Sequence, residues 1–286
     1  MNDPVQRQAV FNAASHDQWA AFAGHREKVS ALLGVGTIPS GGRLCVLGAG
    51  NCNDLDLPAL LKAHRALHLV DLDPEALTRG VNRQGVADHP SLERSGGIEL
   101  TGMLDVIASW SPGTTIPPAA IAALAEWPAR RVAPILPGPF DIVASTCLLS
   151  QLIGNVFPAV GDRHPQFMAL VQAIRIGHLR LLAELCAPGG TVVLVTDVVS
   201  SDTFPALGSF AGSALPGLLP RLTRERNFIN GVNPDVLLSI YRRDPVLAPD
   251  VTGLELIAPW IWNLHTRLYL VVAIKYRKRA SGFLRS

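Results

Sequence analysis

The sequence is poor in cysteine, nearly balanced in charge and free of long apolar runs. Its four cysteines are scattered over 286 residues and form no C-x-x-C pair, so neither a zinc site nor a disulfide framework is expected. The formal net charge of +2 gives no broad field that would attract nucleic acid. No apolar run approaches the length that spans a bilayer, and no signal-like stretch opens the sequence. We therefore expect a cytoplasmic protein that binds no metal and has neither nucleic acid nor a membrane as its partner.

Apolar residues are abundant enough for a large folded core. They make up 48% of the chain against 17% charged residues, which is not the composition of a disordered protein. Beyond residue 40, short apolar runs alternate with helical patterns, and this alternation predicts a parallel, doubly wound α/β sheet. The predicted strands lie at 44–47, 68–70, 98–100, 140–144 and 191–196. Two last runs, Gly253–Ala258 and Thr266–Tyr276, indicate an antiparallel pair that closes the sheet.

Two segments lie outside this alternation. Residues 1–40 carry apolar residues at helical intervals up to Leu33, which predicts an N-terminal helical segment that covers the ligand-binding edge or pads the sheet. Its His16 and His25 are expected at the surface or at an edge. Residues 41–286 form the main domain, in which an insertion at about 200–250 follows the fifth strand. Because open α/β sheets bind ligands at the carboxyl ends of their strands, we expect this insertion to be a lid or cap. Exposed apolar residues in both segments are compatible with a homodimer.

The most informative stretch follows the first predicted strand. The chain turns through Gly48-Ala49-Gly50 and enters a segment, Asp54 onward, that can start a helix. This geometry presents backbone N–H groups and a helix N-terminus at the edge of a parallel sheet. Gly48 would permit a tight reversal, and Gly50 would let a ligand approach the backbone. About 20 residues further on, Asp71 ends the second strand, where a carboxylate can accept hydrogen bonds from both hydroxyls of a ribose.

Taken together, these landmarks resemble those of the class I S-adenosylmethionine-dependent methyltransferases. They read VLGAGNCNDL, LHLVDLDPEAL, GMLDVIA, FDIVASTCLLSQL and LCAPGGTVVLVTD, and the resemblance covers about Gly41 to Arg277 without the insertion. It implies a Rossmann-like, seven-stranded sheet, mostly parallel with an antiparallel C-terminal strand, and S-adenosyl-L-methionine as the cofactor. The sequence departs from the family in two places: Leu47 precedes the turn without the usual acidic residue nearby, and the turn continues with unusually polar residues.

The resemblance also assigns roles by position around the glycine turn. The Gly48-Ala49-Gly50 backbone would pass under the methionine part of the cofactor. The polar residues Asn51 and Asp54 would help to bind its amino-acid end, although Asp54 would equally serve as the cap of the following helix.

The remaining assignments concern the nucleoside and the fourth strand. Asp71 would hold the ribose diol and Leu72 would line the adenine. Asp105 would accept from the adenine amino group, and Val106 would donate its backbone N–H. The pair Ser145-Thr146 would lie near the cofactor where the fourth strand ends.

The activity that the resemblance implies is methyl transfer to a small-molecule nucleophile by in-line displacement, with an oxygen, nitrogen or sulfur acceptor. An oxygen acceptor would need a base, for which His164, His265 and Asp197 are the candidates near the carboxyl edge. Trp260 and Trp262 either line an aromatic or cationic substrate pocket or pack in the core. The N/D-P-P-Y/F motif, which in the family marks methylation of bases and amide nitrogens, is absent after the fourth strand and argues against such substrates.

Two alternatives share these sequence features. A nicotinamide-dependent oxidoreductase would also use Gly48, Gly50 and Asp71, but the third glycine of the dinucleotide fingerprint is missing and the C-terminal hairpin is unexpected for it. A non-catalytic, methyltransferase-like binding protein stays open as well, because this chemistry requires no particular catalytic residue.

Overall fold

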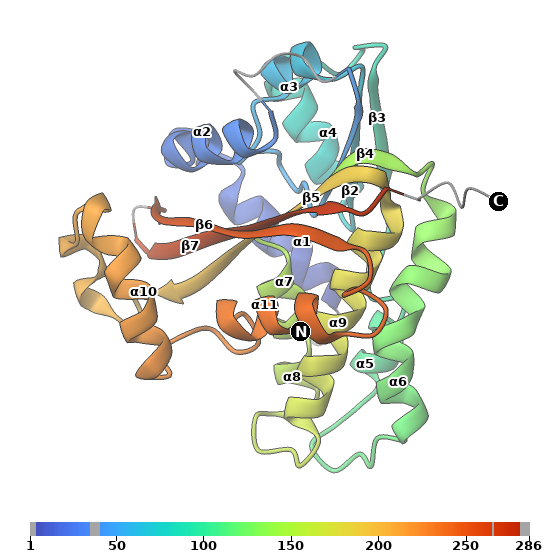
Figure 1. Ribbon diagram of the computed structural model, residues 1–286, viewed down its shortest axis with the longest axis vertical. Helices are drawn as coiled ribbons and strands as arrows, with labels where there is room; N and C mark the ends of the chain where they lie inside the picture. Colours follow the sequence, from blue (N-terminus) through green and yellow to red (C-terminus); the bar gives the residue numbers. More distant parts are fainter. Residues whose placement is uncertain (1–3, 35–40, 265, 281–286) are drawn as a thin grey trace.

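The computed structural model describes residues 4–34, 41–264 and 266–280. They form a seven-stranded sheet in the order β3-β2-β1-β4-β5-β7-β6 (Figure 1). The first five strands run parallel, and β7 is antiparallel to both β5 and β6. The strands are β1 Arg43–Leu47, β2 Ala66–Asp71, β3 Leu92–Gly96, β4 Phe140–Thr146, β5 Cys186–Ser200, β6 Val251–Asn263 and β7 Leu268–Lys278. The predicted mostly parallel sheet with an antiparallel C-terminal strand is confirmed.

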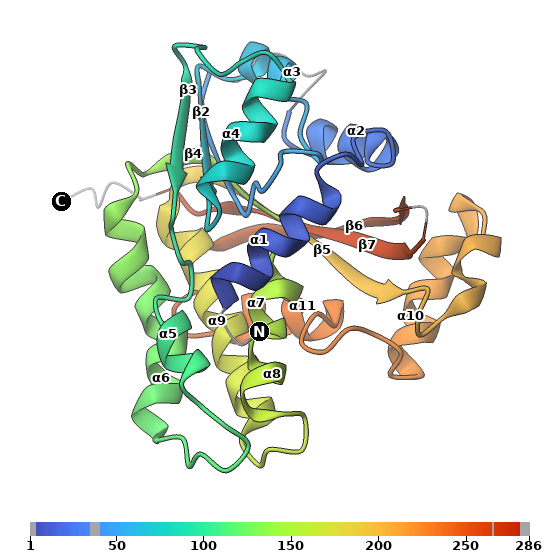
Figure 2. The same cartoon turned by 180° about the vertical axis from the view of Figure 1, so that it is seen from behind.

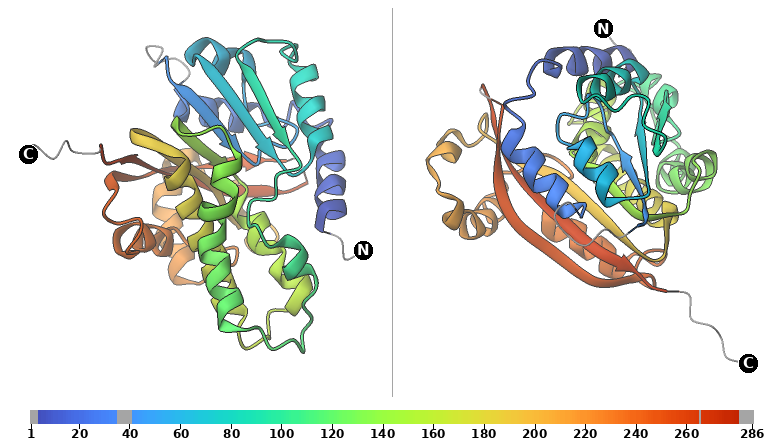
Figure 3. Two further views of the ribbon diagram at one scale, coloured as in Figure 1. Left: turned by 90° about the vertical axis from the view of Figure 1, so that its right-hand side faces the viewer. Right: turned by 90° about the horizontal axis from the view of Figure 1, so that it is seen from above.

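Helices cover both faces of this sheet (Figure 3). One face carries α2 Ala23–Leu32, α3 Leu57–Ala63 and α4 Pro74–Arg83. The other face carries α5 Leu104–Ala108, α6 Pro118–Trp127, α7 Leu149–Gly154, α8 Val156–Val160, α9 Phe167–Leu185 and α11 Pro234–Arg243. Short turns η1 Pro128–Val132 and η2 Ala133–Ile135 continue α6. Helices on both faces give the doubly wound architecture that the alternating pattern predicts.

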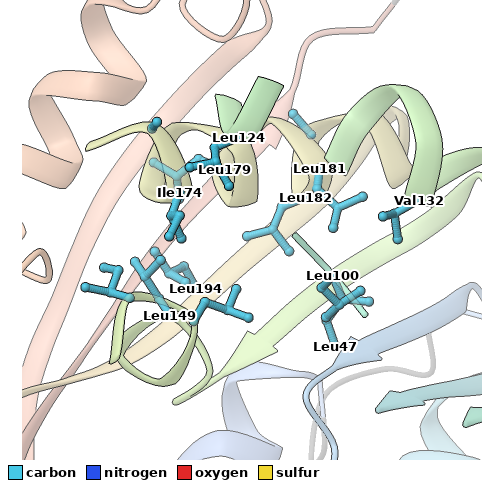
Figure 4. Packing of buried hydrophobic residues seen from close by; sticks show 14 of the residues in the cluster. Leu47, Leu100, Leu124, Val132, Leu149, Ile174, Leu179, Leu181, Leu182 and Leu194 are labelled. Carbon is cyan, nitrogen blue, oxygen red and sulfur yellow. The ribbon is translucent and has the colours of Figure 1, made fainter. Parts of the chain in front are cut away.

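Alternate residues of each strand enter two separate cores, because successive side chains of a strand point to opposite faces. In β1, Leu44 and Val46 pack on the side of α2–α4, whereas Cys45 and Leu47 pack on the side of α6 and α9. Figure 4 shows the second core, where apolar side chains of α9 lie between α6 and the sheet. Gly177 lets α9 approach α6 closely, since a Cβ there would collide with a carbonyl oxygen of α6. Packing on both faces fixes the carboxyl ends of the central strands.

Two local boundaries differ from the sequence prediction. The third strand was expected to begin at residues 98–100, but β3 is Leu92–Gly96, which is largely exposed and half polar. An edge strand of this kind lacks the apolar run that marks a buried strand, so the prediction chose the next apolar run instead. The helix expected from Asp54 begins at Leu57, because the Asp56 carboxylate accepts the backbone N–H of Ala59 at 3.0 Å and caps it.

The two segments outside the alternation occupy different places. The N-terminal helix α1 Pro4–Ser15 crosses the carboxyl ends of β1 and β2, between α4 and α7 (Figure 2). The insertion contains η3 Pro205–Ser209, η4 Gly212–Ala214 and α10 Leu215–Arg224, followed by α11. Leucines of α10 pack against the far ends of β5 and β7, where they form a small core of their own.

Candidate functional site

The backbone of the glycine turn after β1 lines a cavity. Gly48 and Gly50 have φ of +75° and +48°, values that favour glycine. A Cβ on Gly48 would lie 2.9 Å from the Cβ of Leu148, so a side chain there would displace a neighbour. The N–H groups of Gly48 and Ala49 both donate to the Val70 carbonyl, at 2.9 and 3.2 Å, and tie the turn to the end of β2.

Asp71, the last residue of β2, is held against this turn. Its Oδ2 accepts the backbone N–H of Gly50 at 2.7 Å, and its Oδ1 accepts that of Asp73 at 2.9 Å. Burial raises the pKa of Asp71, while these backbone donors act in the opposite direction. The carboxylate is 4% exposed but lines the cavity, and each oxygen keeps a further lone pair for a ligand.

The cavity has a volume of about 550 Å³ and lies at the carboxyl ends of the central strands. Its walls come from the glycine turn, from the residues that end β4 and β5, from α1 and α7, and from the β6–β7 hairpin. A narrower extension shares Gly48, Asp71 and Leu148 with it and continues along Leu72, Ile98 and Leu100. The site therefore combines a large chamber that has many polar side chains in its wall with a narrow slot in which leucine and isoleucine side chains predominate, and Asp71 lines both.

Two further carboxyl groups face the chamber. Asp54 and Asp197 are 9% and 8% exposed, and burial raises the pKa of each to about 6. The Ser150 hydroxyl donates to Asp197 Oδ1 at 2.7 Å and orients that carboxylate. At neutral pH, both groups carry mostly negative charge in a poorly hydrated place. Next to these two carboxyl groups, the chamber therefore favours a ligand group with positive charge, although Arg7 and Arg267 line other parts of its wall.

An aromatic wall closes the end of the chamber at the hairpin. Trp262 lines the cavity beside Tyr269 and Phe22, with ring centroids 5.4 and 4.9 Å from its own. His25 stacks on Trp262 at 4.5 Å and accepts a hydrogen bond from Trp260 Nε1 at 3.1 Å. The expectation that His25 lies at the surface or an edge is wrong, because it is 2% exposed. Burial lowers its pKa to about 3, so the wall contains a neutral histidine.

The polar residues after the glycine turn hold α1 over the cavity. Asn51 Nδ2 donates to the Asn12 carbonyl at 2.6 Å, and Asn53 Nδ2 donates to the Ser15 carbonyl at 2.8 Å. The last carbonyl groups of a helix lack partners within the helix, and these amides supply them. Asn12 Nδ2 also donates to Asp73 Oδ2 at 3.0 Å. This polar segment thus fastens a helix that forms part of the cavity wall.

The structure brings most of the predicted cofactor residues together. Gly48, Ala49, Gly50, Asn51, Asp54, Asp71 and Thr146 line the chamber, and Leu72 lines the slot. Ser145 points to the other face of β4, where its hydroxyl lies 2.8 Å from His178 Nε2 in the core. Asp105 and Val106 are exposed on α5, and the described wall of the slot ends at Leu104. The structure therefore separates Ser145, Asp105 and Val106 from the rest.

Two of the three candidate bases, Asp197 and His164, lie in different places. Asp197 lines the chamber, whereas His164 contacts the Thr114 carbonyl with its Nε2 at 2.9 Å, away from the described cavity wall. His265 lies outside the described residues. No residue of the 200–250 insertion is among the described residues that line the cavity, so its function as a lid stays a prediction.

Sequence reasoning missed the polar residues that two helices place around the cavity. Gln8 and Asn12 enter it from α1, and Gln151 and Asn155 from α7 and the residue after it. Arg7 Nη2 donates to Asn155 Oδ1 at 3.2 Å and links these two sides. These residues belong to no motif and meet only through tertiary contacts, so the local sequence carries no signal for them.

Three further features of the described residues concern metal ions, membranes and cysteines. In the described ranges, no group of three or more His, Cys, Asp or Glu side chains is arranged to hold a metal ion. Within the same ranges, none of the helices is both long and apolar enough to cross a membrane. All four cysteines are buried and unpaired.

Comparison with known proteins gives no sequence match but several structural ones. No protein-family model and no curated protein matches the chain. The N-methyltransferase NodS from Bradyrhizobium japonicum WM9, solved with S-adenosyl-L-homocysteine, is 11% identical over 90% of this chain and 87% of its own, with a TM-score of 0.43. An O-methyltransferase family protein from Burkholderia thailandensis is 13% identical over 96% and 60%, with a TM-score of 0.45. YcgJ from Bacillus subtilis is 12% identical over 90% and 100%, also at 0.45. These are remote likenesses in overall fold.

Proposed function

We propose that the protein transfers a methyl group from S-adenosyl-L-methionine to a small-molecule nucleophile. The observation that carries this proposal is the position of Asp71. Its carboxylate is fixed against the Gly50 N–H and lines both the large chamber and the narrow, mainly apolar slot. A nucleoside needs these three features in this order: an acceptor pair for its ribose, a flat apolar place for its base, and room beyond for its 5′ substituent.

The residues present fit this cofactor. The slot beside Leu72, Leu100 and Leu148 would take the adenine, and Asp71 would take the ribose hydroxyls. The glycine turn would present its backbone to the cofactor without a side chain, since a Cβ on Gly48 would come too close to Leu148. Asp54 would bind the ammonium group of the amino-acid end and so replace the acidic residue that is absent before the turn. When bound, S-adenosyl-L-methionine supplies a methyl group that its sulfonium already activates.

The protein therefore mainly has to align the acceptor and exclude water. Alignment at near-attack distances supplies much of the acceleration in such reactions, on the order of 7–11 kcal/mol at best. The helix α1, fastened by Asn51 and Asn53, closes the chamber from one side. Asp197 stands in the chamber wall with its carboxylate oriented by Ser150 and would hold or accept a proton there.

The charges of the chamber support a small-molecule acceptor rather than nucleic acid. Asp54, Asp71 and Asp197 place three carboxyl groups in the cavity wall. Arg7 and Arg267 also line the cavity, but Arg267 is paired with Asp202 at 2.7 Å. Phosphate groups placed against the three carboxyl groups would be repelled, because like charges in a poorly hydrated cleft interact strongly.

Calorimetry with S-adenosyl-L-homocysteine and with NAD tests the proposal. We expect the first ligand to bind with a stoichiometry of one and NAD to give no saturable heat. Binding of NAD without binding of S-adenosyl-L-homocysteine would favour the oxidoreductase instead. Incubation with labelled cofactor and a metabolite extract then tests catalysis, since a binding protein without activity would label nothing.

A further inference from the structure

Asp197, Trp262 and Tyr269 lie on one face of the sheet, at the side of the chamber formed by β5, β7 and β6. Asp197 of β5 pairs with Val271 of β7. Tyr269 is two residues from Val271 and therefore points to the same face, and it pairs with Trp262 of β6. All three side chains line the cavity. They form what we call the acceptor wall, separated from Asp71 by β1 and β4.

The carboxylate of the acceptor wall has no cationic partner in the part of the chain that the structure describes. Among the described residues, no Lys, Arg or His lies within ion-pair distance of Asp197. The nearby Arg267 is paired with Asp202 at 2.7 Å and donates to the Tyr269 hydroxyl at 3.2 Å. The other neighbours of Asp197 are the Ser150 hydroxyl and the side chains of Cys147 and Tyr269, whose pKa values the negative charge of Asp197 raises. Buried carboxylates in proteins are normally paired, so an unpaired one that faces a cavity calls for a cation from outside.

The aromatic part of the acceptor wall is suited to the same cation. Trp262 is the best aromatic side chain for a cation–π contact. His25 stacks on its ring at 4.5 Å, Phe22 and Tyr269 lie beside the ring at 4.9 and 5.4 Å, and Trp262 is itself one of the residues that line the cavity. Because His25 is uncharged in its buried place, it does not repel a cation across the ring.

We propose that the acceptor wall binds an ammonium group, so that the methyl acceptor is a primary or secondary amine carried by a small molecule. This rests on the proposed function, because it names the acceptor of that reaction. The ammonium would lie against the Asp197 carboxylate with the Trp262 ring beside it. Asp197 then takes one proton at Oδ2, since Oδ1 already accepts from Ser150. The N–H bond breaks, its electron pair stays on nitrogen as the nucleophilic lone pair, and the proton later leaves to solvent. That lone pair would form the new N–CH3 bond while the S–CH3 bond of the donor breaks and leaves its electron pair on sulfur.

Asp54 does not compete for this role. It follows the glycine turn on the side of β1, where the amino-acid end of the cofactor would lie. Asp71 would hold the ribose of the cofactor and lies beyond β1 and β4, away from the acceptor wall. Asp197 is thus the carboxylate of the cavity left for the acceptor.

Calorimetry with an amine and its neutral counterpart tests the inference. The probes are 2-phenylethylamine and 2-phenylethanol, each titrated into the protein saturated with S-adenosyl-L-homocysteine. We expect the amine to bind about tenfold more tightly than the alcohol or better, since a charge-assisted contact of this kind exceeds a neutral one by that factor. Asp197→Asn should lower the affinity for the amine by about tenfold or more and leave that for the alcohol and for S-adenosyl-L-homocysteine unchanged.

A control and a second variant keep the test decisive. Asp162→Asn removes an exposed carboxylate outside the described cavity wall and should change none of these affinities. Trp262→Leu should lower the affinity for the amine more than the affinity for the alcohol, because both probes lose apolar contact but only the amine loses the cation–π contact. Equal binding of amine and alcohol, absent binding of the amine, or an unaltered amine affinity in Asp197→Asn would overturn the inference alone. Failure of S-adenosyl-L-homocysteine to bind the unmodified protein would overturn the proposed function as well.

Discussion

Replacement of Asp71 by alanine should weaken binding of S-adenosyl-L-homocysteine by at least about tenfold. The carboxylate would form two charge-assisted hydrogen bonds with the ribose diol, each worth about 1.5–3 kcal/mol when partly desolvated. The desolvation that raises the pKa of Asp71 offsets part of this binding free energy. The variant should therefore lose at least about 1.4 kcal/mol of binding free energy, which is a tenfold loss of affinity. The variant also removes the acceptor of the Gly50 N–H, which loosens the turn in the same direction.

The assay is calorimetric titration of both proteins at the same pH and salt concentration. Asp56→Ala is the matched control, because Asp56 is also a carboxylate that accepts a backbone N–H, that of Ala59, but it lies outside the described cavity wall. The control should lower the free energy of unfolding by about 1 kcal/mol and leave the affinity unchanged. An affinity in Asp71→Ala within about threefold of the unmodified protein would refute the assignment of the ribose to this carboxylate.

Three further predictions concern the same cavity. Asp197→Asn should raise the free energy of unfolding at pH 7.5 by about 1–3 kcal/mol, because burial raises the folded pKa of Asp197 to about 6 and so penalises its ionised form. This gain should disappear as the pH falls through 6 toward 4, and urea unfolding that gives the same gain at both pH values would contradict the cause. Gly48→Ala should lower the free energy of unfolding by about 1–3 kcal/mol, since φ is +75° and the Cβ would crowd Leu148, whereas Gly24→Ala meets open space in a helix and should not destabilise. Asn51→Ala should speed hydrogen exchange of the α1 amides, while Asn227→Ala, which removes an amide–carbonyl bond to Thr203 elsewhere, should leave them unchanged.

The strand–turn–helix unit and the position of Asp71 next to it could be predicted from the sequence alone. Gly48, Gly50 and Asp71 are close in sequence and belong to one βαβ unit, so their spacing determines that they meet at one edge of the sheet. The position of β7 between β5 and β6 agrees with the antiparallel pair that the two final apolar runs indicate.

The third strand and its neighbourhood could not be placed in this way. β3 lies at the edge of the sheet, none of its residues is buried and only Leu92 is a large apolar residue, so its sequence gives no apolar run. The shift of this strand moves the slot to residues 98–104, and Asp105 remains outside its described wall. The boundary of the strand was wrong, and the adenine roles of Asp105 and Val106 stay predictions.

Side chains that meet only through tertiary contacts were missed for a different reason. His25 looks like a polar position of an amphipathic helix, yet Trp260 and Trp262 of a hairpin more than 200 residues away bury it. The residues of α1 that enter the cavity are likewise brought there by Asn51 and Asn53 after the glycine turn. Neither contact has a period or a spacing that a single sequence displays.

The crystal structure of the protein with S-adenosyl-L-homocysteine tests the central claim most directly. The account predicts both ribose hydroxyls within about 3 Å of the Asp71 carboxylate, the adenine in the slot between Leu72 and Leu148, and the sulfur on the side of the chamber toward Asp197. A nucleoside bound elsewhere, or one whose ribose does not contact Asp71, would contradict it.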